Sequence, residues 1–576
     1  MFNEYMILRT PRRGLISGLA LALLISFMPA DGFTATSSNS KVYPGRITAP
    51  EESPVRGIQK RLKEIGLYNG PLNGRLDEKT VDAIRAYQKQ AGLPVDGLAN
   101  GPLLYHLDSA AHQAQRLLGQ LEKSRLKQSK AAQDALASNP KIQSLLKTPG
   151  NKNHETTATN SNPDNSRSCY AFPTPACLIS EALAATESIK KTELRNWALS
   201  GLVASQAFAG DVSAALKIAT RISDPRLIMT ALGRISQAQV LAGRMTDAQE
   251  TAAAIPDHRL QAQAYLAIAN GQLLAGNPGL AQTNLKSSLS AAEQIDDAHQ
   301  NALLISEIAK VEAGAGNSEA AGRLLAKAEK MIRKEKKSAN HDRILGQLTA
   351  ARAEIGQLDE AMEMANRITD EEWRVTAYIL VAGYQAEAGN ISGALKLADG
   401  ITSKRFQAIA LSRVAIAQGK AGDDAGAKNT LRRVKDLSKG ISLSYGNDYA
   451  LFRISVAQAK IGLFKEATQT AFRIKNSALQ VRTLWSVTLE QRIANDPDAD
   501  ITEAKTSTAI KALRNDLDKT WLMSDIALAQ MENGFKAKAR KTFDRALLSA
   551  RSLKSDWLRA RALGKLAETL VALKRQ

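Results

Sequence analysis

The chain has 576 residues, more than one hydrophobic core supports, so several domains or one extended array are expected. Aromatic residues make up 5% of the sequence, and the formal net charge is +20 at pH 7. A basic surface suits nucleic acid, anionic lipid or a carboxylate-rich polymer, although a solvated helical surface rich in Lys and Arg has the same composition. The sequence contains no Walker loop, Rossmann fingerprint, nucleophile elbow or metal-binding His pair. We therefore expect no enzyme activity, no cofactor and no metal site.

Residues 1–35 are typical of a secretory signal peptide. Three Arg between positions 9 and 13 form a basic start, and residues 14–28 form an apolar stretch that is too short for a comfortable membrane span. Ala30 and Ala35 offer cleavage sites, and cleavage after the latter leaves a net charge near +19. The paired Arg also resembles a twin-arginine signal, so the export route stays open. We expect a protein of the bacterial periplasm or cell envelope, without a membrane span once the signal is removed.

Residues 51–108 form a short block with two helical patterns and several turn signals. Val55–Ile65 has apolar residues at helical spacing and ends at Gly66, and the second pattern follows Asp77, a typical N-cap. The block resembles the small peptidoglycan-binding domain found on wall hydrolases and envelope proteins. The resemblance rests on a Gln-Leu helix, a Gly-rich turn, a Thr-led helix that ends in aromatic-Gln, and a Gly-Leu-x-x-Asp-Gly segment. The matching residues are Gln59, Leu62, Gly66, Tyr68, Gly70, Asn73, Gly74, Thr80, Ala83, Ile84, Tyr87, Gln88, Gly92, Leu93, Asp96, Gly97 and Leu107.

This resemblance implies a three-helix fold and peptidoglycan as the ligand. Candidate ligand contacts are four turn residues that we expect to be exposed: Tyr68, Asn69, Asn73 and Arg75. The Arg75 guanidinium is suited to pairing with a stem-peptide carboxylate. For the matching Gly and Gln residues we expect a structural role.

Residues 109–168 separate this block from the rest of the chain. Residues 109–136 have the pattern of a polar helix with Leu on one side. Residues 137–168 show no hydrophobic period, so they cannot bury enough surface to fold and are expected to form a flexible linker.

A short turn written Ala-Gly, Ile-Gly or Asn-Gly recurs through residues 169–576. Successive turn glycines lie 33 or 40 residues apart, except for one double step in which Asn495 stands where a Gly is missing. The nine turn glycines are Gly210, Gly243, Gly276, Gly316, Gly356, Gly389, Gly422, Gly462 and Gly534.

Two further positions recur with each turn glycine. Five residues after it stands an Ala: Ala215, Ala248, Ala281, Ala321, Ala361, Ala394, Ala427, Ala467 and Ala539. Eight residues before it stands an aliphatic residue: Leu202, Ile235, Ile268, Ile308, Leu348, Val381, Val414, Ile454 and Ile526.

The repeat predicts a helix A, a tight turn at Gly, a helix B and a turn into the next pair. Gly ends helix A because it adopts a left-handed backbone without strain, and the Ala lets helix B approach closely. Since no pair buries its apolar face alone, the pairs stack into one continuous core. The seven-residue difference between repeats equals about two helical turns, so we expect the longer repeats to have a longer helix B.

The register extends beyond the nine glycines at both ends. Cys177 lies 33 residues before the first of them, with Ala182 and Ile189 at the offsets of a short repeat. We therefore expect the array to start with a lone helix B directly after Cys177. At the other end, residues 557–573 have the pattern of a final helix A.

Paired helices with Gly in the turn and a small residue early in the second helix resemble tetratricopeptide-like repeats. The resemblance covers residues 169–576 and implies an α-solenoid whose concave face binds proteins. The repeat lengths depart from the usual period of about 34, so a neighbouring helical-repeat family remains open. The expected fold class is therefore all-α, with a small three-helix domain followed by a long solenoid.

Cys169 and Cys177 are the two cysteines of the chain. In an oxidising compartment we expect them to form a disulfide whose loop covers the exposed first helix, the alternative being two free thiols.

A Gln recurs four residues before the turn glycine, on the same face as the aliphatic position. We expect it to be at least half buried with a partner on a neighbouring helix, the alternative being a stripe that faces a ligand. The position is occupied by Gln206, Gln239, Gln272, Gln385, Gln418, Gln458 and Gln530, with Glu312 and Arg352 in the other two repeats.

Three functions are open at this stage. The leading hypothesis is an exported envelope scaffold that holds peptidoglycan with its N-terminal module and binds a protein partner with its solenoid. The alternatives are a regulator or recruiter of a wall hydrolase or secretion machine, and a polyanion-binding protein that uses its basic surface. We expect no nucleic-acid partner.

Overall fold

The computed structural model describes residues 54–91, 93–140, 142–143, 168–333, 339–441 and 447–575. Within these ranges the regular structure is helical and no β-strand occurs. The described chain divides into two compact units, of which the first ends at Ala131 and the second begins at Ala132. The signal peptide expected over residues 1–35 lies outside the described residues. None of the described helices combines the length and apolar character that a membrane crossing requires.

The N-terminal unit packs three helices around a small core: α2 (Pro54–Glu64), α3 (Glu78–Gln90) and the first turns of α4 (Gly101–Ser138). Asp77 caps α3 by accepting a hydrogen bond from the Thr80 amide, as its place before the helix predicts. α4 is one helix of 38 residues, so the third helix of the module continues directly into the polar helix expected over 109–136. The core consists of Ile58, Leu62, Tyr68, Ala83, Ile84, Tyr87, Leu103 and Leu107.

The first residues of the expected linker are ordered against the second unit. The Asn139 amide donates a 3.1 Å hydrogen bond to the Ala254 carbonyl, and Ile142 is fully buried. Residues 144–167, the remainder of that linker, lie outside the described residues.

The second unit contains ten consecutive helix pairs in the part of the chain that the structure describes. Helix A of each pair is α8 (Thr192–Phe208), α10 (Pro225–Leu241), α12 (His258–Leu274), α14 (Ala298–Gly314), α16 (Ala339–Glu354), α18 (Glu371–Glu387), α20 (Lys404–Lys420), α22 (Asp448–Lys460), α24 (Ser477–Ile493) and α26 (Asp516–Glu532). Helix B of each pair is α9 (Val212–Ala219), α11 (Met245–Ala254), α13 (Pro278–Ala292), α15 (Ser318–Arg333), α17 (Leu358–Asn366), α19 (Ile391–Asp399), α21 (Asp424–Lys439), α23 (Phe464–Phe472), α25 (Ala499–Ala512) and α27 (Lys536–Arg551).

Repeat length is set by helix B. It has 8 to 10 residues in the short repeats and 14 to 16 in the long ones. The difference of about two turns, as predicted, changes the length of the helix while rotating its buried face only slightly. Short and long repeats can therefore alternate in one array.

The A–B turn has a left-handed residue in every pair. The nine turn glycines have φ between +74° and +99°. Asn495 has φ +54° and is the one non-Gly residue with positive φ among those described. Asn tolerates this conformation better than other side chains do, so the pair that lacks Gly keeps the same turn.

The three recurring positions of the repeat are buried. The Ala five residues after the turn is at most 1% exposed in all nine repeats, and the aliphatic residue eight before it at most 3%. Five of the seven Gln are at most 4% exposed. In three repeats the Gln carbonyl oxygen accepts a 2.8 Å hydrogen bond from the residue twelve positions later on helix B, as between Gln418 and Thr430. In these three repeats the Gln therefore joins the two helices of its own pair, whereas Oε1 of Gln239, Gln385 and Gln530 is buried without a hydrogen-bond partner among the described residues.

The first helix of the repeat region begins earlier than expected. α7 (Pro175–Glu187) has Thr174 as its N-cap, whose hydroxyl accepts a hydrogen bond from the Cys177 amide. The expected start after Cys177 is wrong, because a Thr N-cap followed by Pro starts the helix three residues earlier, at Pro175. Ala182, at the offset predicted by the repeat, is fully buried.

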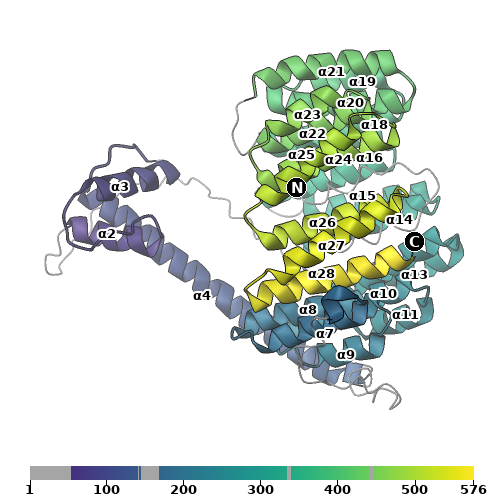
Figure 1. Ribbon diagram of the computed structural model, residues 1–576, viewed down its shortest axis with the longest axis horizontal. Helices are drawn as coiled ribbons and strands as arrows, with labels where there is room; N and C mark the ends of the chain where they lie inside the picture. The colour runs from purple at the N-terminus through teal and green to yellow at the C-terminus, as the bar shows by residue number, and fades with distance from the viewer. Residues whose placement is uncertain are drawn as a thin grey trace. The chain divides into compact units, whose positions relative to one another are not determined.

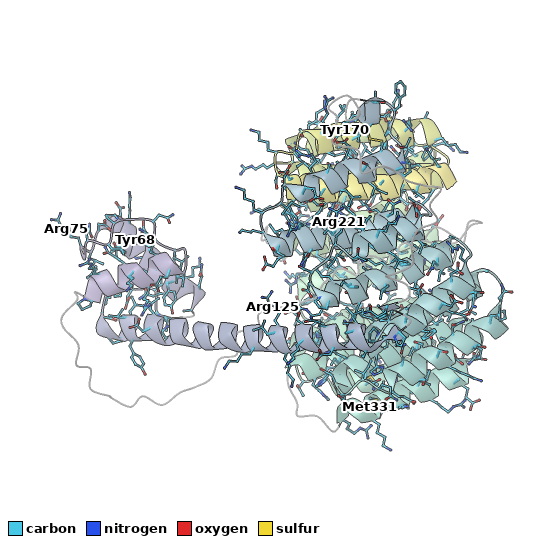
Figure 2. The ribbon with its side chains drawn as sticks, turned by 90° about the horizontal axis from the view of Figure 1, so that it is seen from below. Tyr68, Arg75, Arg125, Tyr170, Arg221 and Met331 are labelled. Carbon is cyan, nitrogen blue, oxygen red and sulfur yellow. A yellow bond between two sulfur atoms is a disulfide. The ribbon has the colours of Figure 1, made fainter. Side chains whose placement is uncertain are left out.

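The disulfide between Cys169 and Cys177 is confirmed. It ties a helical turn over residues 168–171 to the first turn of α7. Tyr170 belongs to that turn (Figure 2). The guanidinium of Arg551, the last residue of α27, lies 5.5 Å from the centroid of the Tyr170 ring.

α7 is not a lone helix. The last helix, α28 (Asp556–Arg575), packs along α7 as helix A packs on helix B in the other pairs, and it also packs against α8 and α26. Figure 1 shows α28 in yellow beside α7 and α8 in blue. Ala185, Ile189, Ala198 and Ala560 form a common core at this contact. The two ends of the repeat region thus complete an eleventh pair and close the solenoid into a ring, so the expectation of a lone first helix B is wrong.

Helices A form the inner wall of this ring. Each helix A contacts the next one around the whole circle, including α28 with α8, whereas helices B mainly contact helices A. In a two-layered ring, neighbouring helices lie closest together in the layer with the shorter circumference. Since helices A contact one another all the way round, they form the inner layer. Eleven helices spaced about 9 Å apart surround a circle roughly 30 Å across between helix axes.

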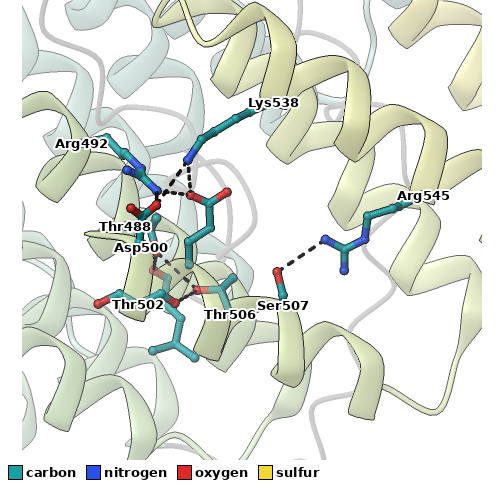
Figure 3. Close-up of polar contacts among 10 residues, drawn as sticks. Thr488, Arg492, Asp500, Thr502, Thr506, Ser507, Lys538 and Arg545 are labelled. Carbon is teal, nitrogen blue, oxygen red and sulfur yellow. Dashed lines mark hydrogen bonds and ion pairs between the residues drawn. The ribbon is translucent and has the colours of Figure 1, made fainter. Parts of the chain in front are cut away.

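Ion pairs bridge neighbouring helices of the outer layer. Arg492 at the end of α24 pairs with Asp500 and Glu503 of α25, and Glu503 also accepts a 2.7 Å hydrogen bond from Lys538 of α27 (Figure 3). The Arg492 and Glu503 side chains are 19% and 25% exposed, and pairs that are reached by solvent contribute about 1 kcal/mol or less each. These pairs lie away from the contact of α28 with α7 and α8 that closes the ring.

The closing contact can be tested at two glycines that lie two residues before the buried aliphatic residue of their helix. A Cβ at Gly564 of α28 would lie 3.0 Å from Leu202 Cδ2, whereas one at Gly233 of α10 would meet nothing within 4 Å. We expect Gly564→Leu to lower the free energy of unfolding by about 1–3 kcal/mol through overpacking. Gly233→Leu is the matched control and should unfold within about 1 kcal/mol of the parent protein. Equal unfolding temperatures for the two variants would contradict this account of the closure.

Candidate functional site

The Gly-rich turn after α2 is built around the side chain of Gln59, which is fully buried. Its Nε2 donates to the Arg75 carbonyl at 2.9 Å, and its Oε1 accepts from the Gly74 amide at 2.9 Å. Asn73 Oδ1 lies 3.1 Å from the same Nε2 and also accepts from the Arg75 amide at 3.0 Å. Gln59 therefore fixes this turn from the inside.

The same arrangement occurs in the turn after α3. Gln88 Nε2 donates to Asp96 Oδ1 at 2.6 Å, and Gln88 Oε1 accepts from the Gly97 amide at 2.9 Å. Asp96 Oδ1 also accepts from the Leu98 amide at 2.9 Å. The hydrogen bonds from Leu98 and then from Gln88 hold the pKa of Asp96 below its usual value. Each buried Gln thus clamps an Asn-Gly or Asp-Gly turn, an equivalence that could not be recognised from the sequence without knowing the hydrogen bonds.

The four predicted ligand contacts do not share one environment. Tyr68 is 2% exposed and its hydroxyl donates to the Pro71 carbonyl at 3.0 Å, so the expectation that it is exposed is wrong. The reason is that its ring fills the module core while its hydroxyl finds a partner in the turn. Asn69, Asn73 and Arg75 are exposed, although the Asn73 side-chain oxygen is held by Gln59. Figure 2 shows Arg75 projecting away from the module.

Exposed apolar side chains stand next to both clamped turns. Leu76 is 49% exposed, Val95 54% and Leu98 56%. The second turn lies against α3, because a Cβ at Gly97 would come within 3.0 Å of Val81 on that helix. We call Arg75, Leu76, Val95 and Leu98 the clamp face. These residues comprise one cation and three exposed apolar side chains, which are the kinds of group suited to a glycan that bears carboxylates.

The second unit offers a different surface, the inner face of the ring. It is formed by the positions 13, 9 and 6 residues before the turn on helices A, and by the corresponding positions of α28. In the described helices these positions hold eight basic and three acidic residues. The basic ones are Arg234, Lys310, Arg343, Arg413, Arg453, Arg482, Arg561 and Lys565, and the acidic ones are Glu307, Asp525 and Glu568.

Water reaches this inner face. The side chains of Glu307 and Arg482 are 57% and 45% exposed, and that of Lys565 is 22% exposed. Lys310 is largely surrounded by protein, and this burial lowers the pKa of its ammonium group. The carboxylates of Glu307 and Glu354 raise the pKa of Lys310 by more, so its net shift is upward. The inner face is therefore solvated in part, although Arg453 is only 6% exposed, and its charge is predominantly basic, which suits an acidic partner.

One family model matches a segment of the chain that contains most of the N-terminal module. Residues 51–107 match the family described as putative peptidoglycan binding domain. No curated protein matches the chain.

Two solved structures show a distant likeness. The crystal structure of Ton1535 from Thermococcus onnurineus NA1 is 16% identical, with a TM-score of 0.26, over 56% of this chain and 97% of that one. A circular tandem repeat protein with novel repeat topology and enhanced subunit contact surfaces is 12% identical, with a TM-score of 0.16, over 90% of this chain and 98% of that one. At these TM-scores neither likeness carries an argument, and the closed ring rests on the contacts within this chain alone.

The two clamps predict separate local effects. Gln59→Leu should leave the Gly74 amide and its neighbours without partners and destabilise that turn by about 1–3 kcal/mol. Hydrogen exchange in the full chain should then accelerate over residues 66–77 and not over 93–100. Gln88→Leu should show the reverse pattern, so each variant is the control of the other. Uniform acceleration over both segments would contradict independent clamps.

Proposed function

We propose that this protein is an exported envelope scaffold without enzyme activity, which attaches to peptidoglycan through its N-terminal module and binds a partner protein on the inner face of its ring. The observation that carries the proposal is the family match over residues 51–107. The two intact Gln clamps support it, because they hold the turns that border the clamp face in one conformation.

The charge of the inner face supports an acidic partner for the ring. Eight basic residues against three acidic ones favour association with a negatively charged surface, and the basic residues come from seven of the eleven helices A. A wall hydrolase or a component of a secretion machine fits the same architecture as the partner.

The same surplus of basic residues favours one competing function, that of a polyanion-binding protein. In that case the ring itself attaches to the carboxylates of the wall, and the module contributes little. The two proposals differ in their dependence on salt, because a purely electrostatic attachment is screened at physiological ionic strength.

Sedimentation with purified peptidoglycan sacculi separates the two functions. We expect the full chain and a fragment over residues 54–131 to pellet at about 0.15 M salt, and a ring fragment over 132–575 to stay largely in solution. If the ring fragment pellets and the N-terminal fragment does not, the polyanion function is the better one.

A pair of variants tests the clamp face in the same assay. Arg75→Ala should reduce the pelleted fraction of the full chain several-fold, because it removes the cation that pairs with a carboxylate. Arg56→Ala removes an equal charge from the exposed side of α2 and should leave the pelleted fraction unchanged. Equal losses in both variants would point to net charge instead of a defined contact.

A further inference from the structure

The closing pair brings together charged residues from opposite ends of the repeat region. We call six of them the seam cluster: Arg234, Arg482, Asp525, Arg561, Lys565 and Glu568. They lie on the inner face of four helices A, which are α24, α26, α28 and α10. α8 lies between α28 and α10 in the ring and has Gly201 and Ala204 at the same register, so charged residues flank small ones.

One half of the cluster is a chain of ion pairs. Asp525 contacts Arg482 at 3.4 Å on one side and Lys565 at 3.2 Å on the other. Burial lowers the pKa of Lys565, but the carboxylates of Asp525 and Glu568 raise it by more, so this ammonium stays charged. These three residues form a fixed wall between α24 and α28.

The other half spans α8. Glu568 accepts a 2.9 Å hydrogen bond from the Ser205 hydroxyl, and burial raises the pKa of Glu568. Arg234 approaches from α10 on the far side of α8 and is attracted to Glu568, while burial lowers the pKa of Arg234. The Arg234 Nε–H is buried and has no hydrogen-bond partner among the described residues. A buried donor of this kind is available to an incoming acceptor.

The centre of the cluster is open. A Cβ at Gly201 of α8, the helix that packs against both α28 and α10, would meet nothing within 4 Å. One turn earlier on the same helix stands Trp197, with 48% of its surface exposed.

Aromatic rings complete the surroundings. The Arg561 guanidinium lies 4.7 Å from the ring centroid of Trp521 and 4.9 Å from that of Trp557. Neither of these two indole N–H groups has a hydrogen-bond partner in the described part of the chain. Four cations against two acids, unpaired donors and an exposed indole face together suit a ligand that has both a carboxylate and a flat, partly apolar ring.

We propose that the seam cluster is a second binding site, which takes a soluble peptidoglycan fragment by pairing its carboxylate with Arg234 and Lys565 and placing its sugar ring over Gly201 against Trp197. The choice of a wall fragment rests on the proposed function of the N-terminal module; the site itself rests on the geometry of the ring. The ring then senses free fragments, while the module holds the intact wall.

Calorimetric titration of the full chain with N-acetylmuramyl dipeptide tests this site. We expect Arg234→Gln and Gly201→Leu each to weaken binding by about tenfold or more, because one removes a charged donor and the other fills the bare surface. Arg413→Gln, at the register of Arg234 but on α20, should bind within about twofold of the parent protein. Unchanged thermal unfolding of Gly201→Leu would show that the ring is intact.

Two comparison ligands define the chemistry. Chitotriose, which lacks a carboxylate, should not bind to the ring site, and an acidic dipeptide without the sugar should bind more weakly than the muramyl dipeptide. Equal affinity of the sugar-free dipeptide would overturn the assignment to a wall fragment, and wild-type affinity of both seam variants would overturn the site. If the full chain fails to bind sacculi but still binds the muramyl dipeptide in a way that depends on Arg234, only the anchoring function of the module is refuted.

Discussion

The packing of α28 against α7 and α8 is the contact on which the architecture of the second unit depends. The end repeats of an open solenoid need a polar outer face, because each would otherwise expose the apolar side that its neighbour covers elsewhere. Here the last helix A and the first helix B cover each other, and Ala560 lies in one core with Ala185 and Ala198. Every helix A therefore has neighbours on both sides, and the small residues at the closing contact allow the close approach that this requires.

The closed ring separates two kinds of surface chemistry. Apolar and amide side chains are buried between the layers, partly exposed ion pairs bridge the outer helices, and a predominantly basic surface faces inward. The N-terminal module has its own chemistry, in which Gln59 and Gln88 hold two turns and leave apolar side chains and Arg75 to the solvent. An interaction with an extended polymer and one with a smaller acidic partner can therefore be optimised independently.

The sequence predicted the repeat well, because glycine spacing determines which helices are paired and how long helix B is. It even indicated that Asn495 replaces a turn glycine. Closure of the ring could not be predicted in the same way. It depends on the small rotation of each helix pair relative to the one before it, and on the sum of these rotations over all pairs. A sign of it was present, since an unpaired helix B near residue 177 and an unpaired helix A after residue 556 are two halves of one pair. Tyr68 was misjudged for a related reason: its burial follows from a core assembled by distant residues.

The closing pair also sets an order on the formation of the ring. Its two helices stand at opposite ends of the repeat region, so their contact closes a very long loop. The entropic cost of closing such a loop grows only slowly with its length. The contact itself can form only once the whole repeat region has been synthesised. Synthesis proceeds from the N-terminus and domains fold as they emerge, so the ten internal pairs can stack while the first helix still awaits its partner. During that interval the molecule is an open arc with a gap. A bulky or threaded partner therefore has access to the inside without any later opening of the finished circle.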